Sequence, residues 1–355
     1  MASNLVPEAM LLPAEGRKED RGSRLLTVDN LSIDFVSVDG RVRVLNGVSL
    51  QVNKGEVVGL VGESGSGKTT LGLAILGLLD SPPADIVSGS VTFEGRNLLH
   101  LKGEEMEKIR GTGINMVFQE PLDSLNPVYR IESLIEEAVE VHRKRNPSST
   151  ESSKDGDTRL ITNLLRDLCI DKPDEVLEQY PHELSGGMRQ RVAISMSIVE
   201  NPKLLIADEP TTGLDAYVQN RILGMLRELR NGGGTLLYVT HDLTVASQIC
   251  DRLYIMYAGR IMEVGATHAT LDDSLHPYTR TLIASVPEGF EDSPPLPVQL
   301  GEPPNLARLP SGCKFNPRCP YVKDICRAEE PQLIEVKPGR YAACWKVGGS
   351  NGRYS

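Results

Sequence analysis

A glycine-rich run at residues 62–70 has the residue types and the spacing that bind phosphate. It reads Gly62, Glu63, Ser64, Gly65, Ser66, Gly67, Lys68, Thr69 and Thr70, which fits in full the pattern G-x4-G-K followed by Ser or Thr. In such a loop the backbone N–H groups turn inward around the phosphates, and the following helix points its positive N-terminus at the same anion. We predict a nucleoside triphosphate site in which Lys68 reaches the β- and γ-phosphates and the Thr69 hydroxyl coordinates Mg²⁺. The alternative, a glycine-rich turn without a ligand, is disfavoured because an apolar strand-like run precedes the loop and a helical pattern follows it.

Two carboxylates and a histidine stand where further strands are expected to end. Asp208 and Glu209 follow the apolar run 204–207, and His241 follows the run 235–240. The carboxyl ends of parallel strands meet at one crevice of an open sheet, beside the phosphate loop. Asp208 is suited to hold Mg²⁺, directly or through water, and Glu209 is suited to polarise an attacking water. His241 could be structural, but its position at a strand end favours a role near the γ-phosphate.

A second motif distinguishes among the many families of proteins that have a phosphate-binding loop. It is the run Leu184-Ser185-Gly186-Gly187-Met188-Arg189-Gln190-Arg191. It resembles the signature motif of ABC ATPases, and it precedes the Asp208-Glu209 pair at that family's spacing. Ser185, Gly186 and Gly187 would open a helix whose N–H groups and dipole can bind a γ-phosphate. In the family that phosphate belongs to the nucleotide on the opposite subunit. The resemblance therefore implies a second, homologous ABC ATPase subunit in a head-to-tail dimer, with ATP as the nucleotide.

Other positions carry the family's roles by resemblance. Gln119 resembles the glutamine that senses Mg²⁺ and the attacking water. Asp215, in the run Gly213-Leu214-Asp215, resembles the aspartate of a loop that crosses the dimer interface, and His241 resembles the switch histidine. Phe35 is the candidate for the aromatic ring that stacks on adenine, and a core residue of a strand is the equal alternative.

The departures from the family's motifs are small. Met188 replaces the glutamine that is commonest in the signature motif, and Gly213 replaces a commoner alanine. Because the catalytic glutamate is present as Glu209, the resemblance implies a site that is competent for ATP hydrolysis.

Three features resemble the oligopeptide, dipeptide and nickel importer branch of the family. They are the run 119–127 (Gln-Glu-Pro-Leu-Asp-Ser-Leu-Asn-Pro), the run His276-Pro277-Tyr278-Thr279, and a cysteine-containing tail that begins at Gly312. The resemblance implies an ATP-hydrolysing subunit that powers import of oligopeptides or dipeptides and lies peripherally at the cytoplasmic face of the membrane. Nickel chelates and oligosaccharides are the alternative cargoes. The implied partners are two transmembrane permease subunits and an extracytoplasmic substrate-binding protein.

The cysteines of the tail have the spacing C-x5-C-x6-C-x17-C, at Cys313, Cys319, Cys326 and Cys344. Four cysteines within about 30 residues of a cytosolic protein suggest a metal more than disulfides. The spacing is neither a C-x2-C zinc pair nor a common ferredoxin run, so it does not choose the metal. Some members of the resembling family carry a 4Fe–4S cluster here, which makes that cluster the leading assignment. Zn²⁺, free thiols and a labile disulfide are the alternatives.

The elements that must position these residues alternate between strands and helices. Apolar alternation or continuous apolar runs predict strands within 25–35, 44–52, 57–61, 204–207 and 235–240, and residues 120–184 read as mostly helical. We predict an α/β fold with a mainly parallel sheet. The resemblance adds an antiparallel β subdomain and an inserted helical subdomain, the architecture of an ABC cassette. The expected division is a tail at 1–23, an ATPase domain at 24–285 with its helical subdomain near 120–190, and a C-terminal extension at 286–355.

Composition argues against other classes of function. The chain has 355 residues and a net charge of −10, from 48 acidic and 38 basic residues, which is unlike a general nucleic-acid binder. No run approaches the ~20 apolar residues of a membrane-spanning helix, so a membrane role is expected to come through partner subunits. A non-transport ABC protein is disfavoured because such proteins usually carry two cassettes or a long coiled coil. A phosphate-loop kinase is disfavoured by the signature motif.

Overall fold

The chain folds into two units that alternate along the sequence. The computed structural model describes residues 23–38, 40–119, 125–145, 154–199, 201–285, 302 and 304–347. The first unit comprises the described residues within Met1–Leu25, Val52–Glu56 and His100–Leu237, and the second comprises those within Leu26–Gln51, Val57–Leu99 and Tyr238–Ser355. The predicted tail lies almost wholly outside the described residues, and so do residues 120–124 of the run 119–127. The division into domains at 24–285 and 286–355 stays a prediction.

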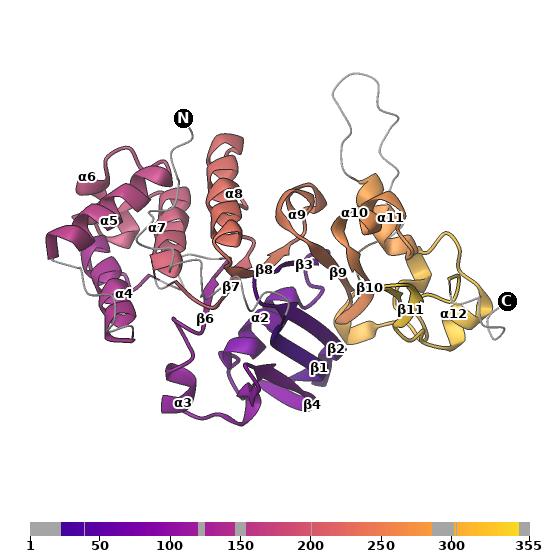
Figure 1. Ribbon diagram of the computed structural model, residues 1–355. Coiled ribbons are helices and arrows are strands. Elements are labelled where there is room, and N and C mark those ends of the chain that lie inside the picture. The colour runs from indigo at the N-terminus through magenta and orange to yellow at the C-terminus, as the bar shows by residue number, and fades with distance from the viewer. Residues whose placement is uncertain are drawn as a thin grey trace, which may run out of the picture. The chain divides into compact units, whose positions relative to one another are not determined.

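The first unit holds a parallel strand pair and most of the long helices (Figure 1). Its elements are α3 (Glu104–Glu107), β6 (Ile114–Val117), α4 (Ile131–Arg145), α5 (Lys154–Asp167), α6 (Pro173–Leu177), α7 (Gly186–Val199), β7 (Leu204–Asp208) and α8 (Ala216–Asn231). β6 and β7 pair in parallel, from Ile114 opposite Leu204 to Val117 opposite Ala207. α4, α5 and α7 pack against one another, with Ile131, Leu134, Ile135 and Ala138 of α4 buried at helical spacing. The expected strands and inserted helices are confirmed.

The second unit contains an antiparallel sheet and a longer mixed sheet (Figure 1). Its elements are β1 (Arg24–Ser37), β2 (Gly40–Asn53), β3 (Val57–Val61), α2 (Lys68–Leu76), β4 (Ala84–Phe93), β5 (Arg96–Asn97), α9 (Leu243–Ile249), β9 (Arg252–Tyr257), β10 (Arg260–Ala266), α10 (Thr267–Asp272), α11 (Pro277–Ala284), α12 (Asp324–Ala328), β11 (Ile334–Lys337) and β12 (Arg340–Ala342). β8 (Thr235–Thr240) begins in the first unit and ends in the second.

Strand order separates the two sheets of the second unit. The antiparallel sheet has the order β2-β1-β4-β5, and the mixed sheet runs β11-β12-β10-β9-β3 within this unit. β3 pairs with β9 in parallel, whereas β9, β10 and β12 pair antiparallel. Every residue of β3 is buried, as its unbroken apolar run predicted for a strand covered on both faces. The α/β class and the predicted antiparallel sheet are therefore confirmed.

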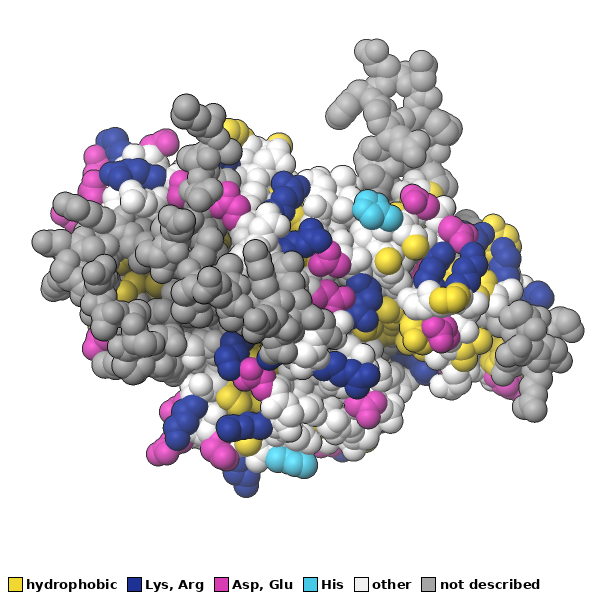
Figure 2. Space-filling model, in the orientation of Figure 1, with side chains coloured by type: hydrophobic (Ala, Val, Ile, Leu, Met, Phe, Trp, Pro, Cys, Tyr) yellow, Lys and Arg dark blue, Asp and Glu magenta, His cyan; other side chains and the backbone are white. Residues whose placement is uncertain are grey.

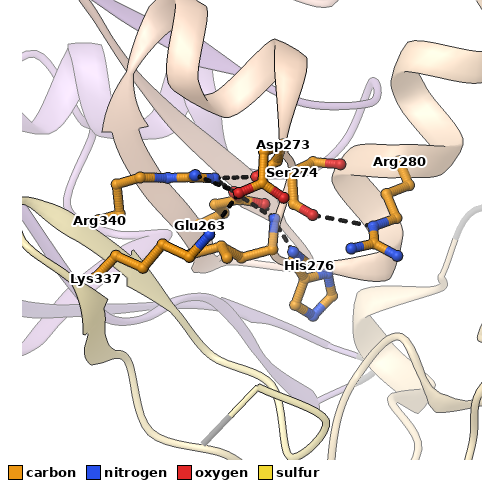
Figure 3. Close-up of polar contacts among 8 residues, drawn as sticks. Glu263, Asp273, Ser274, His276, Arg280, Lys337 and Arg340 are labelled. Atoms are coloured by element: carbon orange, nitrogen blue, oxygen red, sulfur yellow. Dashed lines mark hydrogen bonds and ion pairs between the residues drawn. The ribbon is translucent and has the colours of Figure 1, made fainter.

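A partly buried polar network fastens the C-terminal strands to β10 (Figure 3). The Glu263 carboxylate is fully buried, accepts two backbone N–H groups of the loop before α11 at 2.8 Å, and lies 3.4 Å from Arg340 of β12. Asp273 pairs with Lys337 at 2.6 Å and with Arg340 at 3.1 Å. His276 caps α11, since its Nδ1 accepts the N–H two residues on, at 3.0 Å. Burial lowers the pKa of His276 to about 3, so its ring is neutral near pH 7.

Candidate nucleotide site

The glycine-rich loop connects β3 to α2, as the sequence predicted, and two of its glycines are required by the geometry. Gly67 has φ +101°, a left-handed conformation that L side chains rarely adopt, and it caps α2. A Cβ on Gly62 would lie 2.1 Å from the Met256 carbonyl oxygen, a distance no side chain tolerates. The loop therefore packs tightly against the end of β9 and then turns sharply into the helix. Its exposed crest is Ser64 and Gly65.

Lys68 folds back over its own loop. Its side chain is buried, and Nζ donates to the Gly62 carbonyl at 2.8 Å and to the Glu63 carbonyl at 3.0 Å. Ser66 is also buried, and its Oγ has no hydrogen-bond partner among the described residues. Thr69 and Thr70, in the first turn of α2, are half-buried. An ammonium group and an unsatisfied hydroxyl on one loop are what a phosphate-binding loop provides.

Glu63 is held by residues far along the chain that sequence reasoning missed. Its N–H donates to the Tyr278 hydroxyl at 3.0 Å. Its carboxylate accepts two bonds from the Arg318 guanidinium, Nη1 to Oε2 at 2.8 Å and Nη2 to Oε1 at 3.0 Å. Both partners lie in runs already singled out, beside His276 and Cys319. No spacing rule connects residues 255 positions apart, so the pair could not be found from the sequence.

An aromatic cluster surrounds this contact. The rings of Tyr257, Tyr278 and Phe315 have centroids 4.6 to 5.4 Å apart, and all three residues are almost completely buried. The Arg318 guanidinium lies 5.7 Å from the Tyr257 ring and donates to its hydroxyl at 3.3 Å. Burial alone would lower the pKa of Arg318, but the hydrogen bonds to Glu63 and Tyr257 outweigh burial and leave its pKa raised. Arg318 is therefore a permanent cation in a largely dry site.

His241 lies close to the start of the phosphate loop within the second unit. The Gly62 N–H donates to the carbonyl of Thr240, the last residue of β8, at 3.3 Å. His241 follows directly and is exposed. The next residue, Asp242, caps α9 by accepting the N–H groups of Thr244 and Val245 at 2.7 and 3.3 Å. The strand end and the capped helix fix the backbone on both sides of His241.

In the first unit, Glu209 and Gln119 come together at the ends of β7 and β6. Gln119 Nε2 lies 3.5 Å from Glu209 Oε2, and the Thr212 hydroxyl donates to the same oxygen at 3.0 Å. Glu209 and Asp208 are both buried. Glu209 has φ +47°, a conformation that is strained for a residue with a side chain and is common at functional sites. The predicted general base is thus pre-oriented by a strained backbone.

Gln190, a residue of α7 within the signature motif, holds the backbone at Glu209 and Pro210 in place. Its buried Nε2 donates to the Pro210 carbonyl at 2.8 Å and to the Glu209 carbonyl at 3.4 Å. It therefore fixes the backbone that carries Glu209. Thr212 and Gln190 had no assigned role from the sequence, although both lie next to motif residues.

Two other predicted residues begin helices of the first unit. Ser185 precedes α7, is exposed, and its Oγ accepts the Met188 N–H at 3.3 Å. Gly186 is also exposed and Gly187 is half-buried, so the start of α7 is accessible. Asp215 caps α8, because Oδ1 accepts the N–H groups of Tyr217 and Val218 at 3.0 Å. This cap gives Asp215 a structural role beside the predicted one.

Phe35 lies near the end of β1, opposite Ala84 of β4, and is half-buried. This position fits both an aromatic ring that stacks on adenine and a core residue of the strand, so adenine stacking by Phe35 stays a prediction.

The structure groups the predicted residues in two sets. Residues 62–70 and His241 belong to the second unit, and Gln119, Asp208, Glu209 and the start of α7 belong to the first.

The four tail cysteines line one small cavity. Cys313, Cys319, Cys326 and Cys344 face it together with Phe315, and none forms a disulfide. Burial, with the charges of the neighbouring cysteines, raises the pKa of the Cys313 thiol to about 12 and also raises the pKa of Cys319 and Cys344. Across the described chain, no group of three or more His, Cys, Asp or Glu side chains is arranged to hold a metal ion. The donors are of the type a 4Fe–4S cluster takes, but they are not gathered at ligating distances.

On the face shown in Figure 2, Lys and Arg side chains are interspersed with Asp and Glu side chains over the described residues. None of the helices in the described ranges is long and apolar enough to cross a membrane.

Comparison with known families adds two matches. Residues 45–212 match the ABC transporter family, and residues 262–326 match the C-terminal region of oligopeptide/dipeptide transporters. The first match spans the phosphate loop, the signature motif and Glu209. The second includes Tyr278, Arg318 and three of the tail cysteines.

Curated relatives match over almost the whole chain. A probable peptide ABC transporter ATP-binding protein of Sinorhizobium fredii is 42% identical over 91% of this chain and 95% of its own length. The oligopeptide transport ATP-binding protein of Escherichia coli is 40% identical over 92% of this chain and 95% of its own length. The dipeptide transport ATP-binding protein of the same organism is 42% identical over 90% of this chain and 96% of its own length.

Solved structures with the same fold are ATP-binding cassettes. A dimeric cassette in a post-hydrolysis state, bound to ADP and phosphate, has a TM-score of 0.59 and 27% identity, covering 68% of this chain and 99% of that one. A subunit of the cbiONQ ABC transporter complex from Clostridium perfringens has a TM-score of 0.53 and 26% identity, covering 71% of this chain and 92% of that one.

Proposed function

Since this chain belongs to the family of ATP-binding proteins of ABC transporters, we propose that it is the ATP-hydrolysing subunit of an importer of oligopeptides or dipeptides. One observation carries the proposal. A match to the ABC transporter family at 45–212 and a match to the C-terminal region of oligopeptide/dipeptide transporters at 262–326 occur on one chain. The second region is part of the fold, since Arg318 and Tyr278 contact the phosphate loop directly.

Each residue of the site has a chemical role in this proposal. The loop N–H groups and Lys68 bind the β- and γ-phosphates of ATP. Thr69 and Asp208 would hold Mg²⁺, which would neutralise charge that develops on the phosphates. Glu209 orients and deprotonates the attacking water, and Gln119 and His241 position that water and the γ-phosphate. Phe35 stacks on adenine.

A second cassette completes each site in the proposal. Ser185, Gly186 and Gly187 open a helix and are accessible, so their N–H groups can bind the γ-phosphate of ATP held by a partner subunit. Asp215 follows Leu214 in the loop that meets the partner. Two permease subunits anchor the pair at the cytoplasmic face of the membrane, and an extracytoplasmic binding protein delivers the substrate. Closing and opening of the cassette pair drives the change of access in the permeases.

For the tail, we propose a metal at the cysteine cavity, with a 4Fe–4S cluster preferred to Zn²⁺. The support is chemical: four thiols, one buried and three half-buried, line one cavity, and burial raises the pKa of Cys313, Cys319 and Cys344, a cost that a bound cation would remove. Cys313, Cys319, Cys326 and Cys344 would be the ligands. The test is metal and sulfide analysis of the protein purified without oxygen, beside a variant with all four cysteines changed to serine. Equal iron and zinc in the two proteins would contradict the proposal.

Co-purification tests the transport proposal. After mild solubilisation of membranes, mass spectrometry should recover this chain with two hydrophobic permeases, a second cassette and a binding protein. The reconstituted complex should then hydrolyse ATP faster when the binding protein is loaded with peptide. Stimulation by a nickel chelate or an oligosaccharide instead would replace the cargo. A chain that hydrolyses ATP at full rate without partners would overturn the importer assignment.

A further inference from the structure

We propose that Arg318 is a positioning residue for the ATP site, through which the C-terminal extension holds the phosphate loop in its binding conformation. The inference rests on the proposed function, because it takes residues 62–70 as the ATP site. Arg318 acts through Glu63, the second residue of the loop, and is not expected to touch ATP itself. The extension would then be a working part of the nucleotide site.

The first step of the argument is that Glu63 is fixed through its N–H, its carbonyl and its carboxylate. The N–H donates to Tyr278 at 3.0 Å, the carbonyl accepts from Lys68 Nζ at 3.0 Å, and the carboxylate accepts two bonds from Arg318. The carbonyl also accepts the Ser66 N–H at 3.2 Å. A displacement of Glu63 would therefore move an acceptor of Lys68, the lysine expected to reach the phosphates.

The second step is that the Arg318–Glu63 pair is directional and largely shielded from water. The Arg318 side chain is 5% exposed and the Glu63 side chain 16%. Two parallel N–H···O bonds fix the relative orientation of guanidinium and carboxylate, which a single contact would leave free. The Tyr257 hydroxyl and ring hold the guanidinium from another direction.

The third step is that Arg318 is anchored at its own end. It closes the short 3₁₀ helix Asn316–Arg318, in which its N–H donates to the Phe315 carbonyl at 3.1 Å. The Asn316 amide donates to the Ser311 carbonyl at 2.7 Å, and the Cys313 N–H donates to the Cys326 carbonyl at 2.8 Å. The hydrogen bonds of this loop of the extension therefore fix the position of the Arg318 guanidinium, and a movement of the loop would move Glu63 as well.

A purely structural role makes a different prediction. Replacing a buried ion pair by neutral groups of similar size is often neutral for stability. If the pair only stabilises the fold, ATP affinity should follow the melting temperature. Removing one partner alone leaves the other charge largely buried and unpaired, which lowers stability. The double variant removes both charges and therefore decides between the two roles. If the pair positions the loop, ATP affinity should fall in the double variant although its melting temperature stays close to that of the unaltered chain, and the loss of affinity should be no larger than in a single variant.

The experiment measures the Kd of Mg²⁺–ATP by calorimetry on the full-length chain, together with thermal melting. The variants are Arg318→Met, Glu63→Gln and the double variant. Arg327→Met is the matched control, because this arginine of the same extension is 62% exposed and pairs with Asp324 only at the surface. Lys68→Ala tests the site itself. We expect each single variant and the double variant to raise the Kd by about tenfold, with Arg327→Met unchanged.

The outcomes separate the two proposals. If Lys68→Ala binds ATP like the unaltered chain, residues 62–70 are not the ATP site and both proposals fail. If Lys68→Ala loses binding while Arg318→Met and Glu63→Gln keep the original Kd, only the role of Arg318 fails. Should Arg318→Met not fold, Glu63→Gln decides, because it keeps the shape of the side chain and removes the ion pair. A Kd that rises only in proportion to a lower melting temperature would also overturn the proposal.

Discussion

Glu63 in the phosphate loop and Glu209 at the end of β7 are both largely buried carboxylates of the predicted ATP site, yet their surroundings differ. Glu63 faces a guanidinium that binds both of its oxygens at 2.8 and 3.0 Å. Glu209 faces neutral donors, the Thr212 hydroxyl at 3.0 Å and the Gln119 amide at 3.5 Å. A guanidinium that binds both oxygens fixes a carboxylate in one orientation, whereas neutral donors hold a carboxylate with weaker hydrogen bonds.

The difference indicates that Glu63 holds the phosphate loop in place, whereas Glu209 is placed to take part in hydrolysis. The loop around Glu63 is tied to the extension, to α11 and to Lys68, as a receptor for a highly charged ligand requires. Glu209 stands on a strained backbone, φ +47°, which suits a group that must act on a water molecule. Each prediction below alters one side of this comparison.

The largest effect is expected from Glu209→Gln. The amide keeps the size of the side chain and cannot accept a proton, so kcat for ATP hydrolysis should fall by about 1,000-fold while ATP binding is retained. Steady-state hydrolysis and calorimetric binding measure the two quantities separately. Glu63→Gln is the matched change on the other side and should show the reverse pattern, weakened binding with kcat little altered. Unchanged turnover in Glu209→Gln would remove Glu209 as the base.

The two sides also differ in how far the sequence could predict them. The sequence could predict residues 62–70, Asp208 and Glu209 because phosphate binding requires fixed residue types at short spacing. The strands before them could be predicted from their unbroken apolar runs. The Glu63–Arg318 pair could not be predicted, since it joins residues 255 positions apart and no local pattern records such a contact. The long-range half of the site is set by the docking of the extension, which only tertiary structure reveals.

The docking of the extension is expected to depend on Arg340. Arg340→Met should leave the fully buried Glu263 carboxylate without its cation and lower the free energy of unfolding by about 3 kcal/mol. Chemical denaturation measures the loss. If the extension supports the phosphate loop, the Kd of ATP should rise in the same variant. Lys337→Met, which removes an exposed partner of Asp273, is the control and should change stability by well under about 1 kcal/mol.

His276 should make the fold sensitive to acid. Its pKa is about 3 in the folded chain because the ring is buried, against 6.5 when exposed, so the unfolded chain binds the extra proton between these values. Stability should therefore be fully present above pH 6.5 and fall by about 2 kcal/mol on lowering the pH to 5. Denaturation at both pH values tests this. His276→Asn keeps a helix-capping side chain and should reduce the dependence by that amount. An identical pH dependence in His276→Asn would contradict the assignment.

The smallest effect is expected from Thr212→Val, which removes the 3.0 Å hydrogen bond to Glu209 and keeps the shape of the side chain. Thr212 is exposed, so water can replace part of the lost bond, and we expect a cost of about 1 kcal/mol, a roughly fivefold fall in kcat. Thr212→Ser keeps the hydroxyl and should restore the rate. ATP binding should be unchanged in both, because Thr212 orients the base and not the phosphate loop. A weakened Kd in Thr212→Val would mean that the loop and the catalytic carboxylate are not held independently.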